Sequence, residues 1–254
     1  MTKIITVGLQ KGGVSKTTTS GILSYILSQN HNVLAIDMDS QGNLSQFLSD
    51  VDDVFEEFED QTVLEGIKSG DVRPFIHKLS DTMHLLPAND YLATISQFLY
   101  RKYEGNPSLA LKQSLQPVMD DYDYIIIDTP PSLSEQTINA LSASTHVLIV
   151  TEASQFSFRA IDRFLDMVEG VKERTNPDLK ELGILRTLND SRRTDSKAIV
   201  EIIAEEYDDL CFDTIIQRRA ATGRLAVYGF FDNPELSQAI KQYKNFVKEV
   251  IERV

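Results

Sequence analysis

A short loop near the N-terminus carries the residues with the clearest chemistry. It follows an apolar run over residues 4–9 and precedes a segment with helical spacing over about 17–29. Glycines in such a loop let backbone N–H groups turn towards an anion, and the N-terminal end of the helix adds a positive dipole. A lysine can then reach the β- and γ-phosphates of a nucleotide, and a threonine hydroxyl can ligate Mg²⁺. The spacing therefore predicts a phosphate-binding loop between a strand and a helix. Its residues are Lys11, Gly12, Gly13, Val14, Ser15, Lys16, Thr17 and Thr18.

The loop departs from the general pattern G-x-x-x-x-G-K-[ST], because Gln10 and Ser15 occupy the two glycine positions. Lys11 places a second lysine at the start of the loop. Because an L-residue such as Ser15 avoids some backbone conformations that glycine adopts, we expect a small change in loop geometry at that position. The alternative to a nucleotide site is a glycine-rich turn with incidental lysines.

Carboxylates follow two further apolar runs. Asp37 and Asp39 come after residues 33–36, and Asp128 follows residues 124–127. Continuous apolar runs are typical of parallel strands buried on both faces, and the carboxyl ends of such strands form the rim where α/β proteins bind ligands. Beside a phosphate-binding loop, these carboxylates are best explained by Mg²⁺ and water. For Asp37 the alternative is a helix cap or a solvated strand end.

Three segments resemble the ParA/MinD family of ATPases. Residues 11–17 are similar to the deviant Walker A loop K-G-G-V-G-K-T, with Ser15 in place of its third glycine. Residues 37–43 resemble the family's D-x-D-P-Q-G-N, with Ser40 in place of proline. Residues 125–131, with the sequence I-I-I-D-T-P-P, resemble its Walker B strand and the start of its switch segment.

The resemblance implies roles for individual residues. The catalytic residues would be Lys11, Lys16 and Asp39. Lys11 would reach across a face-to-face dimer to the partner's nucleotide, and Asp39 would orient or activate the attacking water. The residues at the metal ion would be Thr17, Asp37 and Asp128. The residues around the adenine would be Asn189 and Asp190.

The resemblance covers nearly the whole chain and implies a function. It implies an ATPase, with ATP and Mg²⁺ as cofactors, that partitions plasmids or chromosomes. ATP would drive formation of a homodimer that binds DNA without sequence preference, and a ParB-like centromere-binding protein would stimulate hydrolysis. We expect the small type without an N-terminal helix-turn-helix, in the prokaryotic cytoplasm and on the nucleoid when ATP is bound. The alternatives are a MinD-like membrane-cycling ATPase and a positioning protein for another cargo. A signalling GTPase is disfavoured, because the sequence has no Asn-Lys-x-Asp segment to read guanine.

The composition bears on the expected partners. With 25 basic and 38 acidic residues the net charge is −13, which by itself argues against a nucleic-acid-binding protein. An acidic protein can still carry a local basic face. The candidate DNA contacts are Arg218, Arg219, Arg224, Lys241 and Lys244. Solvated arginines that pair with the many acids are the alternative. The single cysteine excludes a disulfide framework within one chain, and the four histidines have no metal-ligand spacing.

The order of apolar strands and helices predicts the fold class. We expect an α/β fold with a doubly wound, mostly parallel sheet and helices on both faces, as in P-loop NTPases. The chain forms one predicted domain over residues 1–254, with an acidic insertion at about 49–81 on the rim. A last helix is predicted from residue 233 to about 253. Its alternative is a membrane-targeting amphipathic helix, but Glu249 and Glu252 dilute its basic face, and no apolar run approaches the ~20 residues that span a bilayer.

Overall fold

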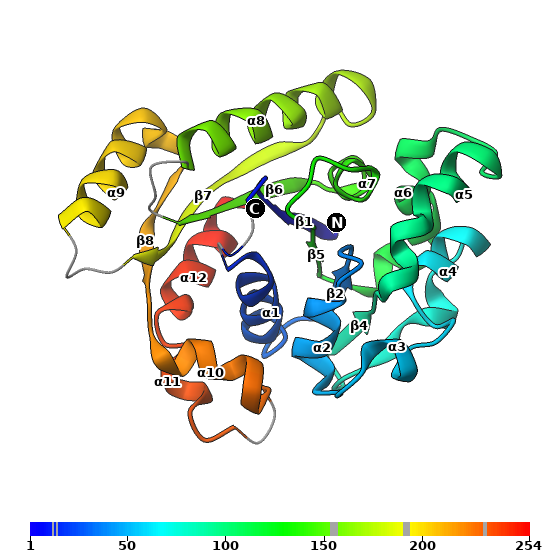
Figure 1. Ribbon diagram of the computed structural model, residues 1–254, viewed down its shortest axis with the longest axis horizontal. Coiled ribbons are helices and arrows are strands. Elements are labelled where there is room, and N and C mark those ends of the chain that lie inside the picture. The colour runs from blue at the N-terminus through cyan, green and yellow to red at the C-terminus, as the bar shows by residue number, and fades with distance from the viewer. Residues whose placement is uncertain (12, 14, 153–156, 190–193, 231–232) are drawn as a thin grey trace.

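An eight-stranded sheet runs through the molecule in the order β3-β4-β2-β5-β1-β6-β7-β8 (Figure 1). The computed structural model describes residues 1–254 except 12, 14, 153–156, 190–193 and 231–232. The strands are β1 (Lys3–Gly8), β2 (Val33–Asp37), β3 (His77–Lys78), β4 (Met83–Leu86), β5 (Tyr124–Asp128), β6 (His146–Glu152), β7 (Lys180–Asn189) and β8 (Cys211–Gln217). Neighbouring strands are parallel except for the short β3, which is antiparallel to β4. The predicted mostly parallel sheet is therefore confirmed.

Helices cover both faces of this sheet (Figure 1). The α-helices are α1 (Lys16–Leu27), α2 (Asn43–Ser49), α3 (Val54–Glu57), α4 (Val63–Ser69), α5 (Ile95–Arg101), α6 (Ala110–Leu115), α7 (Glu135–Ala143), α8 (Ser157–Arg174), α9 (Thr194–Glu206), α10 (Ala220–Tyr228), α11 (Leu236–Ala239) and α12 (Tyr243–Arg253). The 3₁₀ turns are η1 (Arg73–Phe75), η2 (Asp90–Thr94), η3 (Pro107–Leu109), η4 (Gln116–Asp121) and η5 (Asp208–Leu210).

The central strand β5 shows why the apolar runs form this sheet. Side chains of a strand alternate between faces, and both faces of β5 are covered. Ile126 lies in the core cluster that includes residues of α1, α2, α10 and α12, while Ile125 and Ile127 lie in the cluster that includes residues of α4 to α7. All three side chains are fully buried. This confirms the predicted doubly wound arrangement.

The last helix closes one edge of the sheet. Glu249 of α12 accepts hydrogen bonds from the backbone N–H groups of Asp213 (2.8 Å) and Thr214 (3.0 Å) on the edge strand β8. Gln242 exchanges two more with the backbone of Gln217, at 2.9 and 3.0 Å. The predicted single helix over 233–253 is in fact two helices, α11 and α12, separated by a short break.

The apolar face of α12 lies in the core. Its four residues Tyr243, Phe246, Val247 and Val250 are all buried. In this conformation the face is therefore not available to a membrane surface, in contrast to the membrane-targeting alternative. Among the described residues, no helix is both long and apolar enough to cross a bilayer.

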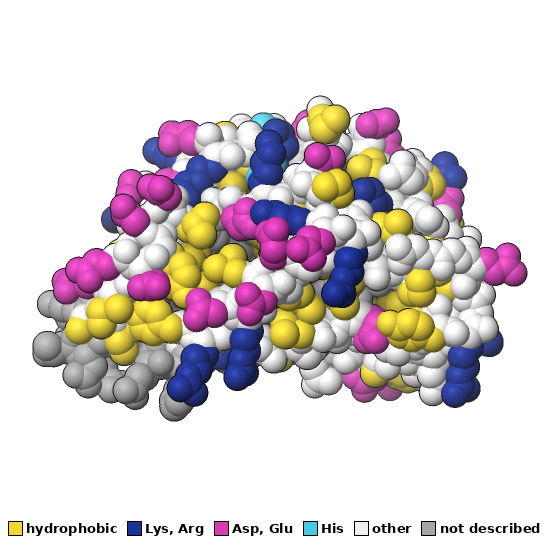
Figure 2. Space-filling view, turned by 90° about the horizontal axis from the view of Figure 1, so that it is seen from above, with side chains coloured by type: hydrophobic (Ala, Val, Ile, Leu, Met, Phe, Trp, Pro, Cys, Tyr) yellow, Lys and Arg dark blue, Asp and Glu magenta, His cyan; other side chains and the backbone are white. Residues whose placement is uncertain are grey.

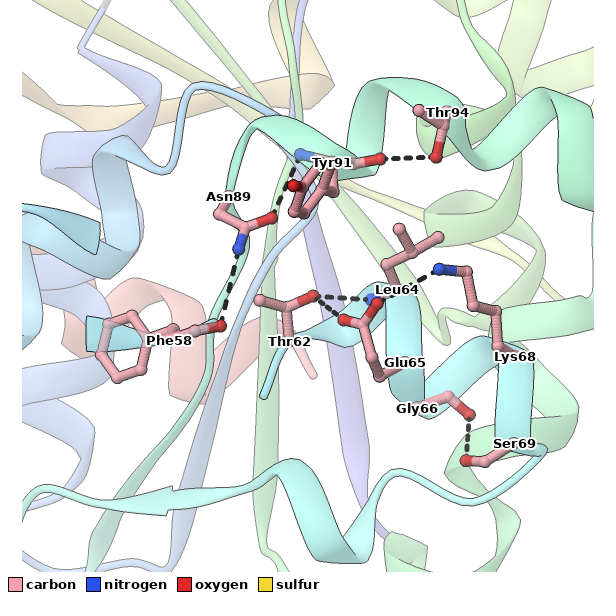
Figure 3. Close-up of polar contacts among 10 residues, drawn as sticks. All are labelled: Phe58, Thr62, Leu64, Glu65, Gly66, Lys68, Ser69, Asn89, Tyr91 and Thr94. Carbon is pink, nitrogen blue, oxygen red and sulfur yellow. Dashed lines mark hydrogen bonds and ion pairs between the residues drawn. The ribbon is translucent and has the colours of Figure 1, made fainter. Parts of the chain in front are cut away.

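The segment predicted as an acidic rim insertion divides into two parts. Thr62 caps α4, since its side chain accepts from the Leu64 N–H and donates to the Glu65 carboxylate (Figure 3). Three apolar residues of α4 are fully buried, and β3 extends the sheet beyond β4. The second half of the segment thus contributes apolar residues of α4 to the core and the short strand β3 to the sheet. That the segment is an insertion on the rim stays a prediction. The amide of Asn89 reaches the Phe58 carbonyl at 3.5 Å and joins the acidic first half to the loop after β4 (Figure 3).

Candidate functional site

The candidate site forms where three adjacent strands end. β5 lies between β2 and β1, and the strand register sets Asp128 beside both Asp37 and Val7. Asp128 and Asp37 are the last residues of their strands, and the phosphate-binding loop follows β1. The tertiary pairing of the strands thus brings together three motifs that are far apart in the sequence.

Among the described residues of the phosphate-binding loop, Gly13 and Ser15 are left-handed. Gly13 has φ 74°, and a side chain there would meet no atom within 4 Å. Ser15, which immediately precedes α1, has φ 68° and ψ 28°. Ser15 thus adopts a left-handed conformation that favours glycine, at a cost of roughly 1–2 kcal/mol for an L-residue. The change in loop geometry relative to a glycine at this position stays a prediction. Gly12 and Val14 lie outside the described residues.

Lys16 is nearly buried beneath this loop, with 7% of its surface exposed. Its ammonium group donates to the backbone carbonyl of Lys11 at 2.8 Å. Burial lowers the pKa of Lys16, and the negative charges of Asp128 and Asp39 oppose that shift. A desolvated cation in this position interacts strongly with an anion in the loop.

Asp128 is fully buried and is bound by two hydroxyl groups of α1. Thr17 Oγ1 donates to Asp128 Oδ2 and Ser20 Oγ donates to Asp128 Oδ1, each at 2.7 Å. Burial raises the pKa of Asp128 to about 6, and the two hydroxyl donors oppose the shift. The predicted metal-site residues Thr17 and Asp128 are thus in direct contact. Sequence reasoning missed Ser20, although its spacing of three from Thr17 puts both residues on one face of the helix.

Asp37 is also fully buried and holds neighbouring parts of the chain. Its Oδ2 accepts from the backbone N–H (2.9 Å) and hydroxyl (2.8 Å) of Ser45 in α2, and its Oδ1 accepts from the Asp39 N–H at 3.0 Å. Burial, followed by the negative charge of Asp128, raises the pKa of Asp37 to about 7. Asp37 therefore anchors both α2 and the loop that carries Asp39. That it lies near a metal ion stays a prediction.

The two buried carboxylates fit a divalent cation nearby. No ion pair within the described part of the chain joins Asp37 or Asp128 to a lysine or arginine. The charge of Lys16 acts on Asp128 without a direct contact and leaves room for a cation to compensate the two carboxylates. The described residues also contain no group of three or more His, Cys, Asp or Glu side chains that could hold a metal ion. A magnesium ion here would rely on phosphate oxygens and water for its remaining ligands, which is the usual arrangement for Mg²⁺ at nucleotides.

A cavity of about 450 Å³ opens above these residues. Such a volume is within the range of small-molecule sites. The predicted site residues that line it are Gly13, Ser15, Lys16, Thr17, Thr18 and Asp39. Thr129 and Pro131, from the segment that resembles the start of the family's switch, also line the cavity. Two more lining residues, Gln41 and Asn43, had no predicted role. Both belong to the segment that follows Asp39, so the match of residues 37–43 to the family's motif was the available signal.

Lys11 is not among the described residues that line this cavity. The Lys11 ammonium forms an ion pair with Glu152, the last residue of β6, at 2.5 Å. Asn189 is the last residue of β7. Asp190 is outside the described residues, so the adenine prediction is untested.

The candidate DNA contacts gather near the junction of β8 with α10 and α12. Arg218 and Arg219 follow β8 and are exposed, as are Lys241 and Lys244 around the start of α12. The hydrogen bonds between Gln217 and Gln242 bring the two pairs to one region.

Arg224 differs from the other four candidates, because its guanidinium is paired with Glu235 at 2.8 Å. Figure 2 shows the molecule from above the view of Figure 1. On this face, the acidic and basic side chains that are drawn in colour lie interspersed. The basic residues near α10 and α12 are therefore the better candidates for a local basic face.

Comparisons with known proteins agree with this geometry. A protein-family model described as an AAA domain matches residues 2–181. The chain is 32% identical to the sporulation initiation inhibitor protein Soj of Bacillus subtilis, over 98% of each chain. It is also 32% identical to the chromosome partitioning protein ParA of Myxococcus xanthus, over 89% of this chain and 79% of that protein.

Solved structures share the fold over most of the chain. Cobyrinic acid a,c-diamide synthase from Mycobacterium smegmatis, with a bound ATP analogue and magnesium, superposes with a TM-score of 0.77 at 35% identity, over 89% of this chain and 91% of that one. A plasmid partition protein from Borrelia burgdorferi superposes with a TM-score of 0.78 at 27% identity, over 100% and 99% of the two chains.

Proposed function

We propose, because this chain belongs to the ParA family, that it is a Mg²⁺-dependent ATPase whose ATP cycle drives the partitioning of plasmid or chromosomal DNA. The observation that carries the proposal is the contact between Thr17 and the buried Asp128 beneath the phosphate-binding loop. A hydroxyl and a carboxylate so placed are the protein ligands that a nucleotide-bound Mg²⁺ requires in P-loop ATPases. The synthase structure with an ATP analogue and magnesium supports the same pair of ligands, ATP and Mg²⁺, for this chain.

The residues of the site divide the work between binding and hydrolysis. Lys16 and the loop N–H groups hold the phosphates. Thr17 and Asp128 would hold Mg²⁺, which would neutralise charge on the phosphate oxygens. Asp39, anchored through its N–H to Asp37, orients the attacking water. Lys11 stabilises the developing charge at the nucleotide of a second protomer, as an arginine finger does.

A switch follows from this division, because the nucleotide is part of the dimer interface. The dimer is stable while the γ-phosphate is present and loosens after hydrolysis. The exposed basic residues near α10 and α12 hold non-specific DNA in the dimer, and a ParB-like centromere-binding protein stimulates hydrolysis. The burial of the apolar face of α12 favours this function over membrane cycling.

Binding to non-specific duplex DNA tests the proposal. Affinity is measured with ATP, ADP and no nucleotide, each at two salt concentrations. We expect binding that requires ATP and falls steeply with salt, because phosphate contacts release counterions. ATP hydrolysis without DNA binding under any of these conditions would refute partitioning, and co-sedimentation with liposomes would then test the membrane alternative.

The Lys11→Ala variant tests the mechanism separately. It should bind ATP normally, since Lys11 does not line the cavity, and it should lose hydrolysis. Normal turnover would remove the role of Lys11 across the dimer and leave the partitioning function itself in place.

A further inference from the structure

The ion pair between Lys11 and Glu152 is not used by the mechanism described above. Lys11 Nζ lies 2.5 Å from Glu152 Oε1, and the two side chains are 22% and 28% exposed. The pair continues the parallel register of β1 and β6, in which Gly8 lies opposite Ile149. The lysine proposed to act on a second protomer is thus bound to a carboxylate of its own protomer.

Glu152 is held firmly in place by its surroundings. It lies opposite Thr187 on β7, and its backbone carbonyl accepts a hydrogen bond from the Ser157 hydroxyl at the start of α8. Ser157 is fully buried. Because β6 lies inside the sheet, between β1 and β7, Glu152 presents its carboxylate from a rigid element and not from a free loop.

Lys11 is at the same time connected to the phosphate-binding site. Its backbone carbonyl accepts the hydrogen bond from the Lys16 ammonium at 2.8 Å, and its N–H donates to the Leu9 carbonyl at 2.8 Å. The backbone of Lys11 is therefore fixed beside Lys16 while its side chain is directed to Glu152. Only the side chain has to move for Lys11 to reach another anion.

The strength of such a pair suits a reversible contact. Ion pairs that water reaches change an equilibrium by a factor of about two to five. A triphosphate carries several negative charges, so it attracts a lysine more strongly than one carboxylate does. A nucleotide brought close by a second protomer can therefore displace Glu152 from Lys11.

We propose that Glu152 is a positioning residue that holds Lys11 within its own protomer and competes with the partner's nucleoside triphosphate for it. Glu152 thereby raises the protein concentration at which ATP-bound dimers form. This inference rests on the proposed function, because it requires Lys11 to act across a dimer.

The Glu152→Gln variant tests the inference, because it removes the charge and keeps the side-chain size. The dimer dissociation constant is measured by sedimentation with Mg²⁺ and the non-hydrolysable analogue AMPPNP. Loss of an exposed ion pair is expected to change the dimer dissociation constant by up to about fivefold for each protomer. Since both protomers release Lys11, the dimer dissociation constant should fall by up to about 25-fold. The Glu152→Asp variant retains the charge and should return dimerisation towards the wild-type value.

A double-mutant cycle separates this role from a structural one. In a Lys11→Ala background, Glu152→Gln should leave the dimer dissociation constant unchanged, because no lysine remains to be released. Glu181→Gln is a matched control: Lys172 and Glu181 also form a 2.5 Å pair, 23% and 25% exposed, and Glu181 lies near the start of β7, away from the site. It should not change dimerisation.

The outcomes distinguish the inference from the function on which it rests. A wild-type chain that dimerises with AMPPNP, together with a Glu152→Gln variant that dimerises no more tightly, overturns the inference alone. The same holds if the Glu152→Gln effect persists in the Lys11→Ala background. Wild-type and variant chains that both stay monomeric overturn the proposed switch and the inference together.

Discussion

The edge contact between α12 and β8 can be tested with the Glu249→Ala variant. Glu249 accepts hydrogen bonds from the Asp213 N–H, the Thr214 N–H and the Thr214 hydroxyl. Hydrogen bonds to charged groups contribute about 1.5–3 kcal/mol each when sheltered, but Asp213 is exposed and water replaces part of the loss. We therefore expect a decrease of about 2 kcal/mol in the free energy of unfolding. Three such hydrogen bonds fully shielded from water would give a larger decrease. For a chain of this size, the expected decrease lowers the melting temperature by about 4–8 °C.

Glu252→Ala is the matched control for this variant. Glu252 carries the same charge on the same helix and is exposed. Thermal unfolding of both variants is followed by circular dichroism, with light scattering to detect association through the freed strand edge. If the melting temperatures of Glu249→Ala and Glu252→Ala both lie within 1 °C of the wild-type value, the edge contact does not hold α12. If Glu249→Ala instead keeps its stability and gains liposome binding, α12 is a membrane helix and the proposed function is wrong.

Three further predictions concern the loop, the metal site and the basic residues. Ser15→Gly should raise the melting temperature by about 2–4 °C, because it relieves roughly 1 kcal/mol of left-handed strain. Ser15→Ala should not raise it. Equal melting temperatures of the two variants would contradict the strain at Ser15. Thr17→Ala should abolish the stabilisation that Mg²⁺-ATP gives the wild-type chain in a thermal-shift assay, and Thr17→Ser should retain it, since only the hydroxyl contacts Asp128. Arg218→Ala should reduce the slope of log DNA affinity against log salt by about one. Arg224→Ala should change this slope less, because Glu235 already balances the charge of Arg224. A larger change for Arg224→Ala than for Arg218→Ala would assign the phosphate contact to Arg224.

The sequence predicts the centre of this fold better than its edges. The β5 run Ile125–Ile127 is buried on both faces, and a continuous apolar run is a direct signal of that environment. β3 has only two residues, His77 and Lys78, and neither is apolar enough to indicate a strand. It forms because β4 offers a free edge, which is a property of the tertiary structure. The sequence likewise indicates helix α10 (Ala220–Tyr228) only weakly, because Gly223 in its second turn lowers helix propensity.

The candidate site shows the same division between motif and context. Lys16, Thr17 and Asp128 could be identified because each belongs to a motif with fixed spacing. Ser45 could not, because a serine inside a helix has no distinctive pattern until its hydroxyl partner is known. For Ser20 the one signal was its helical spacing from Thr17, which does not by itself identify a partner for its hydroxyl. The left-handed Ser15 contradicts its local preference, as expected where the surrounding structure determines the backbone of a functional loop.

The position of α1 explains why a firmly held α12 matters for the proposed switch. α1 begins in the phosphate-binding loop, and its buried side shares one core cluster with the apolar face of α12. α12 begins beside Lys241 and Lys244, the proposed DNA contacts. Close-packed interiors transmit displacements. Because α1 packs directly against α12, a shift of α1 would displace α12 and the lysines at its start. This coupling exists only while α12 stays on the sheet edge. The buried apolar face of α12 and the Glu249 contact both favour this position, and a membrane-targeting helix would have to leave it.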